Sequence, residues 1–234
     1  ASMVAAVEAI ETEHGAVDVL VNNAGYSQSG PVEEVPLDEA RRQFETNVFG
    51  LARLCQLVLP AMRAQRSGRI VNLSSMGGRM TLPGGGWYHA SKHAVEALSD
   101  ALRFEVAPFG IRVVVVEPGV VVTEFGDTAL ATAEESGDLG GPYATMMAGV
   151  ATAVAGAYRK PKRGSAITPE VVAARIDKAI DARRPKARYV VGAQARQILT
   201  ARALLPDRAW DAFLATQFPK PTPDGPPPGG RAAA

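Results

Sequence analysis

The sequence predicts an α/β fold in which helices cover a parallel sheet. Three short apolar runs, at residues 17–23, 69–75 and 111–116, are rich in Val, Ile and Leu and are typical of buried parallel strands. Longer segments between them, at 37–66 and 88–106, repeat apolar residues at helical spacing. Strands that alternate with helices in this way indicate repeated strand–helix–strand units and therefore a parallel sheet.

Composition favours one domain over residues 1–218, followed by a tail at 219–234 that is rich in Pro and Gly and is expected to be disordered. The 25 basic and 24 acidic side chains nearly balance, so we expect neither a nucleic-acid nor a membrane partner. No apolar run approaches the roughly 20 residues that a membrane helix needs. Cys55 is the single cysteine, which excludes an internal disulfide and predicts a buried structural thiol in a cytoplasmic protein.

The first elements are a helix at 1–13 and the strand at 17–23, which ends in Asn22-Asn23-Ala24-Gly25. A glycine at this point lets the backbone pass close to a ligand. The helix at 37–66 has an apolar stripe that Asn47 interrupts. A buried Asn that bonds to backbone groups would explain this position without a catalytic role.

The strand at 69–75 delivers Ser75 to the carboxyl edge of the sheet, where a neutral hydroxyl can hydrogen-bond a substrate oxygen. Tyr88 and Lys92 stand four residues apart where the next helix begins, so their side chains share one face. For Tyr88 to exchange a proton at neutral pH, its pKa must fall by roughly three units. A lysine ammonium one turn away would supply part of that lowering, so the spacing predicts an acid–base pair.

The loop between Ser75 and Tyr88 is rich in glycine, and two interpretations of it stay open. It is either a flexible surface turn or the border of a substrate pocket that includes Arg79, Met80, Leu82 and Trp87. His89 and His93 are also four residues apart, but no third ligand lies nearby in the sequence, so no metal site is predicted.

Taken together, these motifs resemble the short-chain dehydrogenase/reductase family, and the resemblance runs from residue 1 to about residue 125. The motifs that carry it are Asn22-Asn23-Ala24-Gly25, Ser75, the Tyr88-x-x-x-Lys92 frame and Pro118-Gly119-x-x-x-Thr123. The resemblance implies a Rossmann-like, doubly wound parallel sheet and an oxidoreductase that uses NAD or NADP. It also implies that one Asn of the first motif ties neighbouring strands together.

The same resemblance implies a role for each member of a catalytic group. Tyr88 would act as acid and base, Ser75 would orient the substrate oxygen, and Lys92 would lower the pKa of Tyr88 and hold the nicotinamide ribose. Asn47 would hold a water that connects Lys92 to bulk solvent. The implied cofactor contacts are Asn23, Ala24, Gly25, Tyr88, Lys92, Pro118, Gly119, Val121 and Thr123.

The family's first strand, its Thr-Gly-x-x-x-Gly-x-Gly turn and two further strands have no counterpart in the sequence. We therefore expect a sheet that lacks its first three strands, with the strand at 17–23 as an exposed edge. We also expect the chain to be either a fragment of a longer enzyme or a product that cannot bind cofactor normally.

Residues 124–168 carry no family motif and predict a helical lid in which Tyr143, Met146, Met147 and Tyr158 adapt to an apolar ligand. The helix after Thr168-Pro169 and the strand at 187–191 resemble the 17β-hydroxysteroid and retinol dehydrogenase branch, which implies a hydrophobic alcohol or ketone as substrate. In the family, the helices at 37–66 and 88–106 form subunit contacts, so a homodimer or homotetramer is expected.

Two functions therefore stay open. The first is reversible hydride transfer between a nicotinamide cofactor and an alcohol or ketone, without a metal. The second is a non-catalytic interaction module that pairs its open sheet edge with another chain. An epimerase or dehydratase is disfavoured, because such relatives usually carry a larger C-terminal substrate domain.

Overall fold

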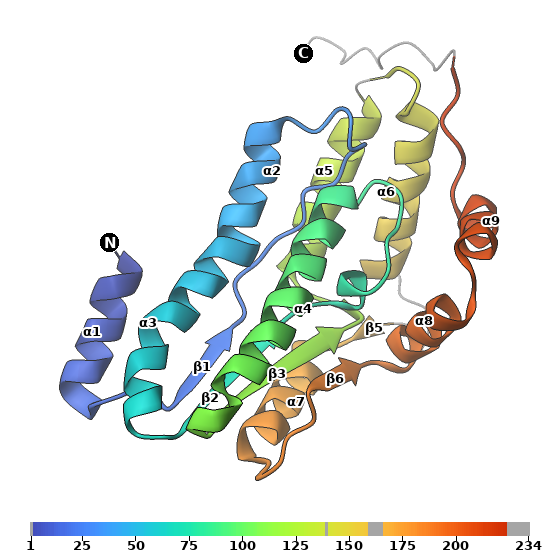
Figure 1. Cartoon of the computed structure of the whole chain (residues 1–234). Helices are drawn as coiled ribbons and strands as arrows, with labels where there is room; N and C mark the ends of the chain where they lie inside the picture. The colour runs from blue at the N-terminus through green and yellow to red at the C-terminus, as the bar shows by residue number, and fades with distance from the viewer. Residues whose placement is uncertain (1, 139, 159–165, 224–234) are drawn as a thin grey trace.

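The computed structural model describes residues 2–138, 140–158 and 166–223. Within these ranges a parallel sheet of four strands runs in the order β1-β2-β3-β6 (Figure 1). Its strands are β1 (Val19–Asn22), β2 (Gly68–Leu73), β3 (Ile111–Pro118) and β6 (Arg188–Val191). Asn22 is in register with Asn72, and Leu73 with Val116, so the carboxyl ends of the strands meet at one edge. The predicted α/β fold is confirmed.

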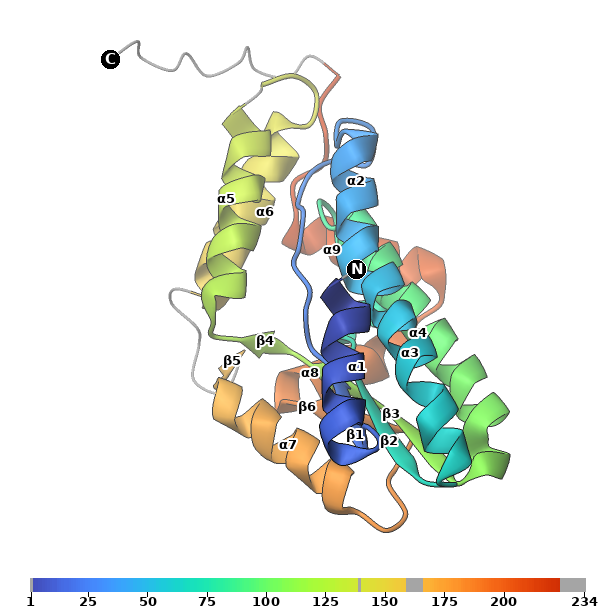
Figure 2. The same cartoon turned by 90° about the vertical axis from the view of Figure 1, so that its left-hand side faces the viewer.

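Helices cover the two faces of this sheet unequally (Figure 2). One face carries α1 (Ser2–His14), α3 (Leu51–Ala64) and α4 (Gly86–Val106), and the other carries α7 (Pro169–Asp181). Met62, Ile70 and Val95 are fully buried beneath the three helices. Val172 and Ile176 of α7 pack with Val71, Leu73 and Val116 on the opposite face. The packed sheet is the rigid frame on which the carboxyl-edge loops are held.

The edge of the sheet at β1 is partly open. Among the described strands β1 pairs only with β2. Val19 and Val21 are each 38% exposed, whereas Leu20, which points to the other face, packs into the core beneath the helices. This arrangement agrees with the expectation that residues 17–23 form an exposed edge.

The sequence analysis predicted one continuous helix at 37–66, and this prediction is wrong. It consists of α2 (Leu37–Phe44), a π-helical segment η1 (Glu45–Gly50) and α3. A π-helix carries more residues per turn than an α-helix, so it shifts the faces of α2 and α3 relative to one another. Asn47, the residue that interrupts the apolar stripe, lies inside the π segment.

Above the carboxyl edge, α5 (Glu124–Asp138) and α6 (Ala144–Tyr158) pack together as an antiparallel pair (Figures 1 and 2). At their base lies a two-stranded parallel ribbon, β4 (Val120–Val121) and β5 (Ala166–Ile167), which the sequence analysis did not predict. The remaining elements are two 3₁₀ turns, η2 (Met76–Gly78) and η3 (Ala107–Phe109), and the helices α8 (Ala193–Leu204) and α9 (Asp207–Gln217).

Two predicted segments lie only partly within the described residues. Residues 159–165 of the predicted lid and 224–234 of the predicted tail fall outside them. The described start of the tail lies along the lid, where the Thr222 amide donates a hydrogen bond to the Pro142 carbonyl at 2.9 Å. In the part of the chain that the structure describes, no helix has both the length and the apolar character needed to cross a membrane.

Candidate active site

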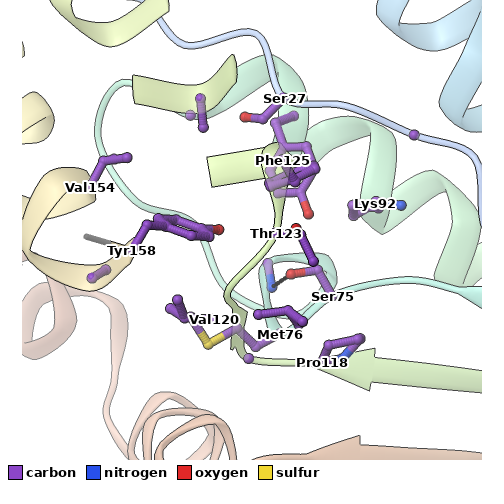
Figure 3. A pocket seen from close by; sticks show the side chains of 18 of the residues that line it. Ser27, Ser75, Met76, Lys92, Pro118, Val120, Thr123, Phe125, Val154 and Tyr158 are labelled. Carbon is purple, nitrogen blue, oxygen red and sulfur yellow. Dashed lines mark hydrogen bonds between the residues drawn. The ribbon is translucent and has the colours of Figure 1, made fainter. Parts of the chain in front are cut away.

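A cavity of about 950 Å³ lies at the carboxyl edge of the sheet, beneath α5 and α6 (Figure 3). This is the edge at which open α/β sheets bind ligands. The predicted site residues that line the cavity are Asn23, Gly25, Ser75, Tyr88, Lys92, Pro118, Gly119, Val121 and Thr123. Ala24 and Asn47 are not among its lining residues. Segments that are far apart in the sequence therefore converge on one cavity, as the motifs predicted.

Ser75 and Tyr88 meet where β2 and α4 approach each other. Ser75 caps η2, and its Oγ accepts a hydrogen bond from the Gly77 amide at 3.0 Å. Burial raises the pKa of Tyr88 to about 12, and a hydrogen bond with Ser75 opposes that rise. The net shift moves the pKa of Tyr88 away from neutrality, so burial outweighs the partial lowering that the sequence analysis expected from Lys92.

Lys92 lies almost completely buried between β2 and the loop that follows β1. Its Nζ donates a hydrogen bond to the Leu73 carbonyl at 2.9 Å. Burial lowers the pKa of Lys92 to about 8, while the charge on Glu96 acts in the opposite direction. A Cβ atom at position 25 would lie 3.4 Å from the Lys92 Nζ and 3.0 Å from the Asn47 Oδ1. A side chain at position 25 would therefore crowd Asn47 and touch Lys92, and glycine leaves this space open.

The side chain of Asn47 is bonded on every side. Its Nδ2 donates to the Tyr26 carbonyl and to the Ser91 Oγ, each at 3.0 Å. Its Oδ1 accepts from the Tyr26 amide at 3.1 Å. These contacts tie the loop after β1 to α4, which matches the structural interpretation that the sequence left open. The role of Asn47 in a water relay stays a prediction.

Asn22 joins neighbouring strands, as the resemblance implied for one Asn of its motif. Its Nδ2 donates to the Asn72 Oδ1 on β2 at 2.9 Å, and the Asn72 Nδ2 donates to the Ser99 Oγ on α4 at 2.9 Å. The same Asn22 amide lies 3.4 Å from the Sγ of Cys55, whose pKa burial raises to about 11. The prediction that Cys55 is a buried thiol is confirmed.

The glycine-rich loop borders the cavity only in part. Met80 and Leu82 line it, as predicted, but Arg79 and Trp87 do not. Arg79 instead turns toward the sheet, where its Nη1 lies 3.4 Å from the Glu117 Oε2. Trp87 packs edge-to-face against Phe44, with ring centroids 6.4 Å apart. Both side chains were misassigned because their direction depends on tertiary partners that a loop sequence does not indicate.

The two histidines of α4 bond to backbone carbonyl oxygens. His89 Nδ1 lies 3.0 Å from the Gly77 oxygen, and His93 Nδ1 lies 2.8 Å from the His89 oxygen. Burial lowers the pKa of His89 to about 4, so its ring is neutral at physiological pH. Within the described ranges, no three His, Cys, Asp or Glu side chains gather in a way that could hold a metal ion.

Sequence reasoning placed Tyr158 in a lid over the ligand but missed the other members of an aromatic and apolar wall. The Phe125 ring lies 5.6 Å from the Tyr88 ring, centroid to centroid. The α6 side of the wall consists of Val150, Ala153, Val154, Ala157 and Tyr158. Their spacing of three and four residues could have identified this face. Met146 and Met147, which the sequence analysis directed toward a ligand, are instead buried between α6 and α5.

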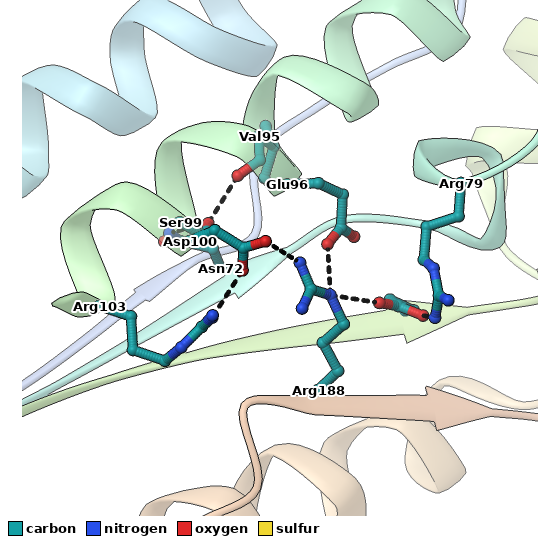
Figure 4. A network of polar contacts seen from close by, with 9 residues as sticks. Asn72, Arg79, Val95, Glu96, Ser99, Asp100, Arg103 and Arg188 are labelled. Atoms are coloured by element: carbon teal, nitrogen blue, oxygen red, sulfur yellow. Dashed lines mark hydrogen bonds and ion pairs between the residues drawn. The ribbon is translucent and has the colours of Figure 1, made fainter.

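A charge cluster around the buried carboxylates Glu96 and Glu117 joins α4 to β3 and β6 (Figure 4). The Arg188 Nε lies 2.9 Å from Glu96 Oε2 and 3.2 Å from Glu117 Oε1, and its Nη2 lies 2.6 Å from Asp100 Oδ2. Arg79 approaches Glu117 from the other side. Burial raises the pKa of Glu117, and the charge on Glu96 raises it further. The cluster connects the helix that holds Tyr88 and Lys92 to the strand end that precedes Pro118.

Comparison with known proteins agrees with this geometry. Residues 1–134 match the family model described as short chain dehydrogenase. An NADPH-dependent 3-dehydrocapnine reductase from Ornithobacterium rhinotracheale is 37% identical over 224 residues, which cover 92% of this chain and 77% of the relative. A 3-ketodihydrosphingosine reductase from Bacteroides thetaiotaomicron is 49% identical over 122 residues, which cover 52% of this chain and 45% of the relative.

Among solved structures, a short-chain dehydrogenase from Streptomyces avermitilis superposes with a TM-score of 0.67 at 32% sequence identity. The match covers 92% of this chain and 73% of that one. The family model, the relatives and the convergence of the motifs on one cavity lead to the same assignment. The chain belongs to the short-chain dehydrogenase/reductase family.

Proposed function

We propose that the protein is an NAD(P)-dependent oxidoreductase that transfers hydride reversibly between a nicotinamide cofactor and a hydrophobic alcohol or ketone. The observation that carries this proposal is the meeting of Ser75, Tyr88 and Lys92 at one cavity on the carboxyl edge of the sheet. A hydroxyl, a phenol and a buried amine at a cavity wall are suited to moving a proton to or from a substrate oxygen.

In the proposed reaction, Tyr88 donates a proton to the substrate oxygen during reduction and accepts it during oxidation. Ser75 orients that oxygen, and Lys92 holds the cofactor ribose and stabilises the Tyr88 phenolate. Asn47 positions the loop after β1 against α4 through its bonds to Tyr26 and Ser91. A bound NAD or NADP would supply the hydride acceptor or donor and, when oxidised, a positive charge near Tyr88.

The residues present fit the nicotinamide end of such a cofactor. Gly25 permits a close backbone approach beside Lys92. Pro118 at the end of β3, Gly119 after it and Thr123 after β4 line the cavity. The word NADPH in the name of the Ornithobacterium relative supports the same class of cofactor.

The apolar wall of α6 supports a hydrophobic substrate, as does the presence of Met80 and Leu82 across the cavity. Both relatives are named as reductases, and the Bacteroides name specifies a keto group. We further place the protein near the 17β-hydroxysteroid and retinol dehydrogenase branch and propose that it acts in the cytoplasm, where an inert single thiol such as Cys55 is expected.

Transfer of a label tests the reaction type. The purified chain is incubated with methyl 3-oxodecanoate and with NADPH or NADH deuterated on either face of nicotinamide C4. We expect one deuterium to appear on the carbinol carbon of the product, detected by mass spectrometry. A folded protein that binds the nucleotide but gives no deuterated alcohol from this or any other hydrophobic ketone would contradict the proposal.

One observation favours a second candidate function, a non-catalytic module that pairs its sheet edge with another chain. Val19 and Val21 leave part of that edge exposed. Calorimetric titration with NADPH, combined with light scattering, separates the two functions. Binding of the nucleotide, by a monomer or by an oligomer formed through α3 and α4, supports the enzyme and counts against the module.

We also propose that the protein forms a homodimer or homotetramer through α3 and α4. Large apolar side chains are exposed on α4 and on η1, which precedes α3: Phe104 is 85% and Phe49 55% exposed. Phe104→Glu should reduce the mass measured by light scattering to that of a monomer, because it places a charge in the apolar contact. Leu204→Glu, on the exposed part of α8, is the matched control and should leave the mass unchanged. A monomeric parent protein would contradict the proposal.

A further inference from the structure

The hydroxyl of Tyr158 is a feature of the cavity that the proposed reaction does not use. Tyr158 is the last residue of α6, and its ring lies directly on Gly126, where an added Cβ would overlap it. Figure 3 shows the ring extending into the cavity, with its hydroxyl toward the side on which Thr123 and Phe125 lie. The bare backbone at Gly126 thus fixes the position of a phenol inside the cavity.

Tyr158 lies close enough to Tyr88 for the two phenols to interact. Burial raises the pKa of Tyr158 well above its ordinary value, and the charge of an ionised Tyr88 would raise it further. The Tyr158 hydroxyl therefore stays protonated at any physiological pH. It can act as a hydrogen-bond donor but not as a second base beside Tyr88.

The α6 wall beside this phenol is apolar, while Thr123 lies on the side toward which the hydroxyl points. Among the α6 residues that line the cavity, Tyr158 alone carries a polar group, and its neighbours on the wall are Val150, Ala153, Val154 and Ala157. A ligand oxygen placed there would lose its contact with water and needs a donor to compensate. A ligand without a polar atom at that point would instead leave the Tyr158 hydroxyl without a hydrogen-bond acceptor.

We propose that Tyr158 binds substrate by donating a hydrogen bond to a second polar atom, beside the oxygen that Ser75 and Tyr88 hold. The substrate class is then a ketone or alcohol with a second hydrogen-bond acceptor next to the reacting carbon and an apolar chain beyond it. This inference rests on the proposed function and narrows its substrate class. The aromatic wall formed by Phe125 and the apolar face of α6 accommodates the chain.

Two ketones of equal chain length test the contact. Methyl 3-oxodecanoate carries an ester beside its ketone, and 5-dodecanone has methylene and methyl groups in the same places. We expect Tyr158→Phe to raise KM for the oxo ester about 10-fold, the value of one neutral hydrogen bond, with little change in kcat. The values for 5-dodecanone should not change, because phenylalanine keeps the packing on Gly126.

Tyr143→Phe is the matched control. Tyr143 also lies in the lid, but its hydroxyl bonds to Glu33 at the surface and it does not line the cavity. The Tyr143→Phe substitution should change neither KM nor kcat for either ketone. If Tyr158→Phe changed KM equally for the two ketones, Tyr158 would only support the apolar wall, and the inference would be overturned.

Direct binding separates this inference from the proposed function. Calorimetry with the two product alcohols, methyl 3-hydroxydecanoate and 5-dodecanol, needs no turnover. Tyr158→Phe should weaken binding of the hydroxy ester about 10-fold and leave 5-dodecanol unaffected. If the wild type reduces neither ketone, the proposed function fails, whereas this comparison still decides the Tyr158 contact. Equal affinity of wild type and variant for the hydroxy ester would overturn it.

Discussion

Tyr88→Phe should lower kcat about 10³-fold, within the range that general acid–base groups contribute. The substitution removes the hydroxyl to which we assign proton exchange with the substrate, but it keeps the ring. That ring packs against Phe125 and lies 5.5 Å from the His89 ring, centroid to centroid, so its packing should be retained. Binding of NADPH, measured by calorimetry, should therefore change little while the rate of ketone reduction collapses.

A matched control for this variant is Tyr189→Phe. Tyr189 is a buried tyrosine on β6 whose hydroxyl accepts a hydrogen bond from the Lys186 amide at 3.2 Å, away from the cavity. It should keep nearly the full rate. Turnover by Tyr88→Phe within a few-fold of the wild type would remove Tyr88 from the mechanism.

Arg188→Met should lower the free energy of unfolding by about 3 kcal/mol, the lower end of what breaking a buried ion pair costs. The lower end applies because the Arg188 side chain is itself 28% exposed, whereas its partners Glu96 and Glu117 are 8% and 0% exposed. Methionine fills similar space but leaves two buried carboxylates without their shared cation. Urea unfolding followed by circular dichroism measures the loss.

The loss in the free energy of unfolding should depend on pH, and the direction of this dependence follows from the pKa of Glu117. Its pKa is raised in the folded protein, so the folded state binds more protons than the unfolded state between the two pKa values. The contribution of Glu117 to the free energy of unfolding is therefore greatest at acid pH and declines as the pH rises. Removing Arg188 raises the folded pKa further, so the deficit of the variant should be larger at pH 8 than at pH 5.5.

Two further variants sharpen the test. Arg103→Met removes an arginine that bridges only Asp100, with both side chains about a third or more exposed, and should cost less than about 1 kcal/mol. Adding Glu117→Gln to Arg188→Met removes one of the stranded charges and should recover part of the loss. Equal destabilisation by Arg103→Met and Arg188→Met would contradict the assigned role of the cluster.

The strands and the catalytic motifs could be predicted because their signals are local. Apolar runs such as the one before Ser75 mark buried strands, and the four-residue spacing of Tyr88 and Lys92 fixes their shared face. One Asn of the Asn22-Asn23 pair was expected to tie strands together, and the bond of Asn22 to Asn72 confirms this. In each case a few adjacent residues carry the information.

The parts that sequence reasoning missed depend on contacts between distant segments. The pKa of Tyr88 is set by burial under a lid whose sequence carries no family motif. Met146 faces α5 and Val154 faces the cavity, although both lie on one helix of mostly small and apolar residues, where no polar face distinguishes inside from outside. The pairing of Arg188 with Glu96 spans 92 residues and is visible only after the sheet is assembled.

That pairing also has a consequence for the order in which the molecule matures during synthesis. Glu96 and Asp100 leave the ribosome long before Arg188, which arrives on the last strand of the sheet. Until β6 docks beside β3, the helix that bears Tyr88 and Lys92 can bury Glu96 only at the cost of an unbalanced charge. The residues proposed for acid–base catalysis therefore precede Arg188 by about a hundred positions, and their electrostatic setting is completed only when β6 has docked.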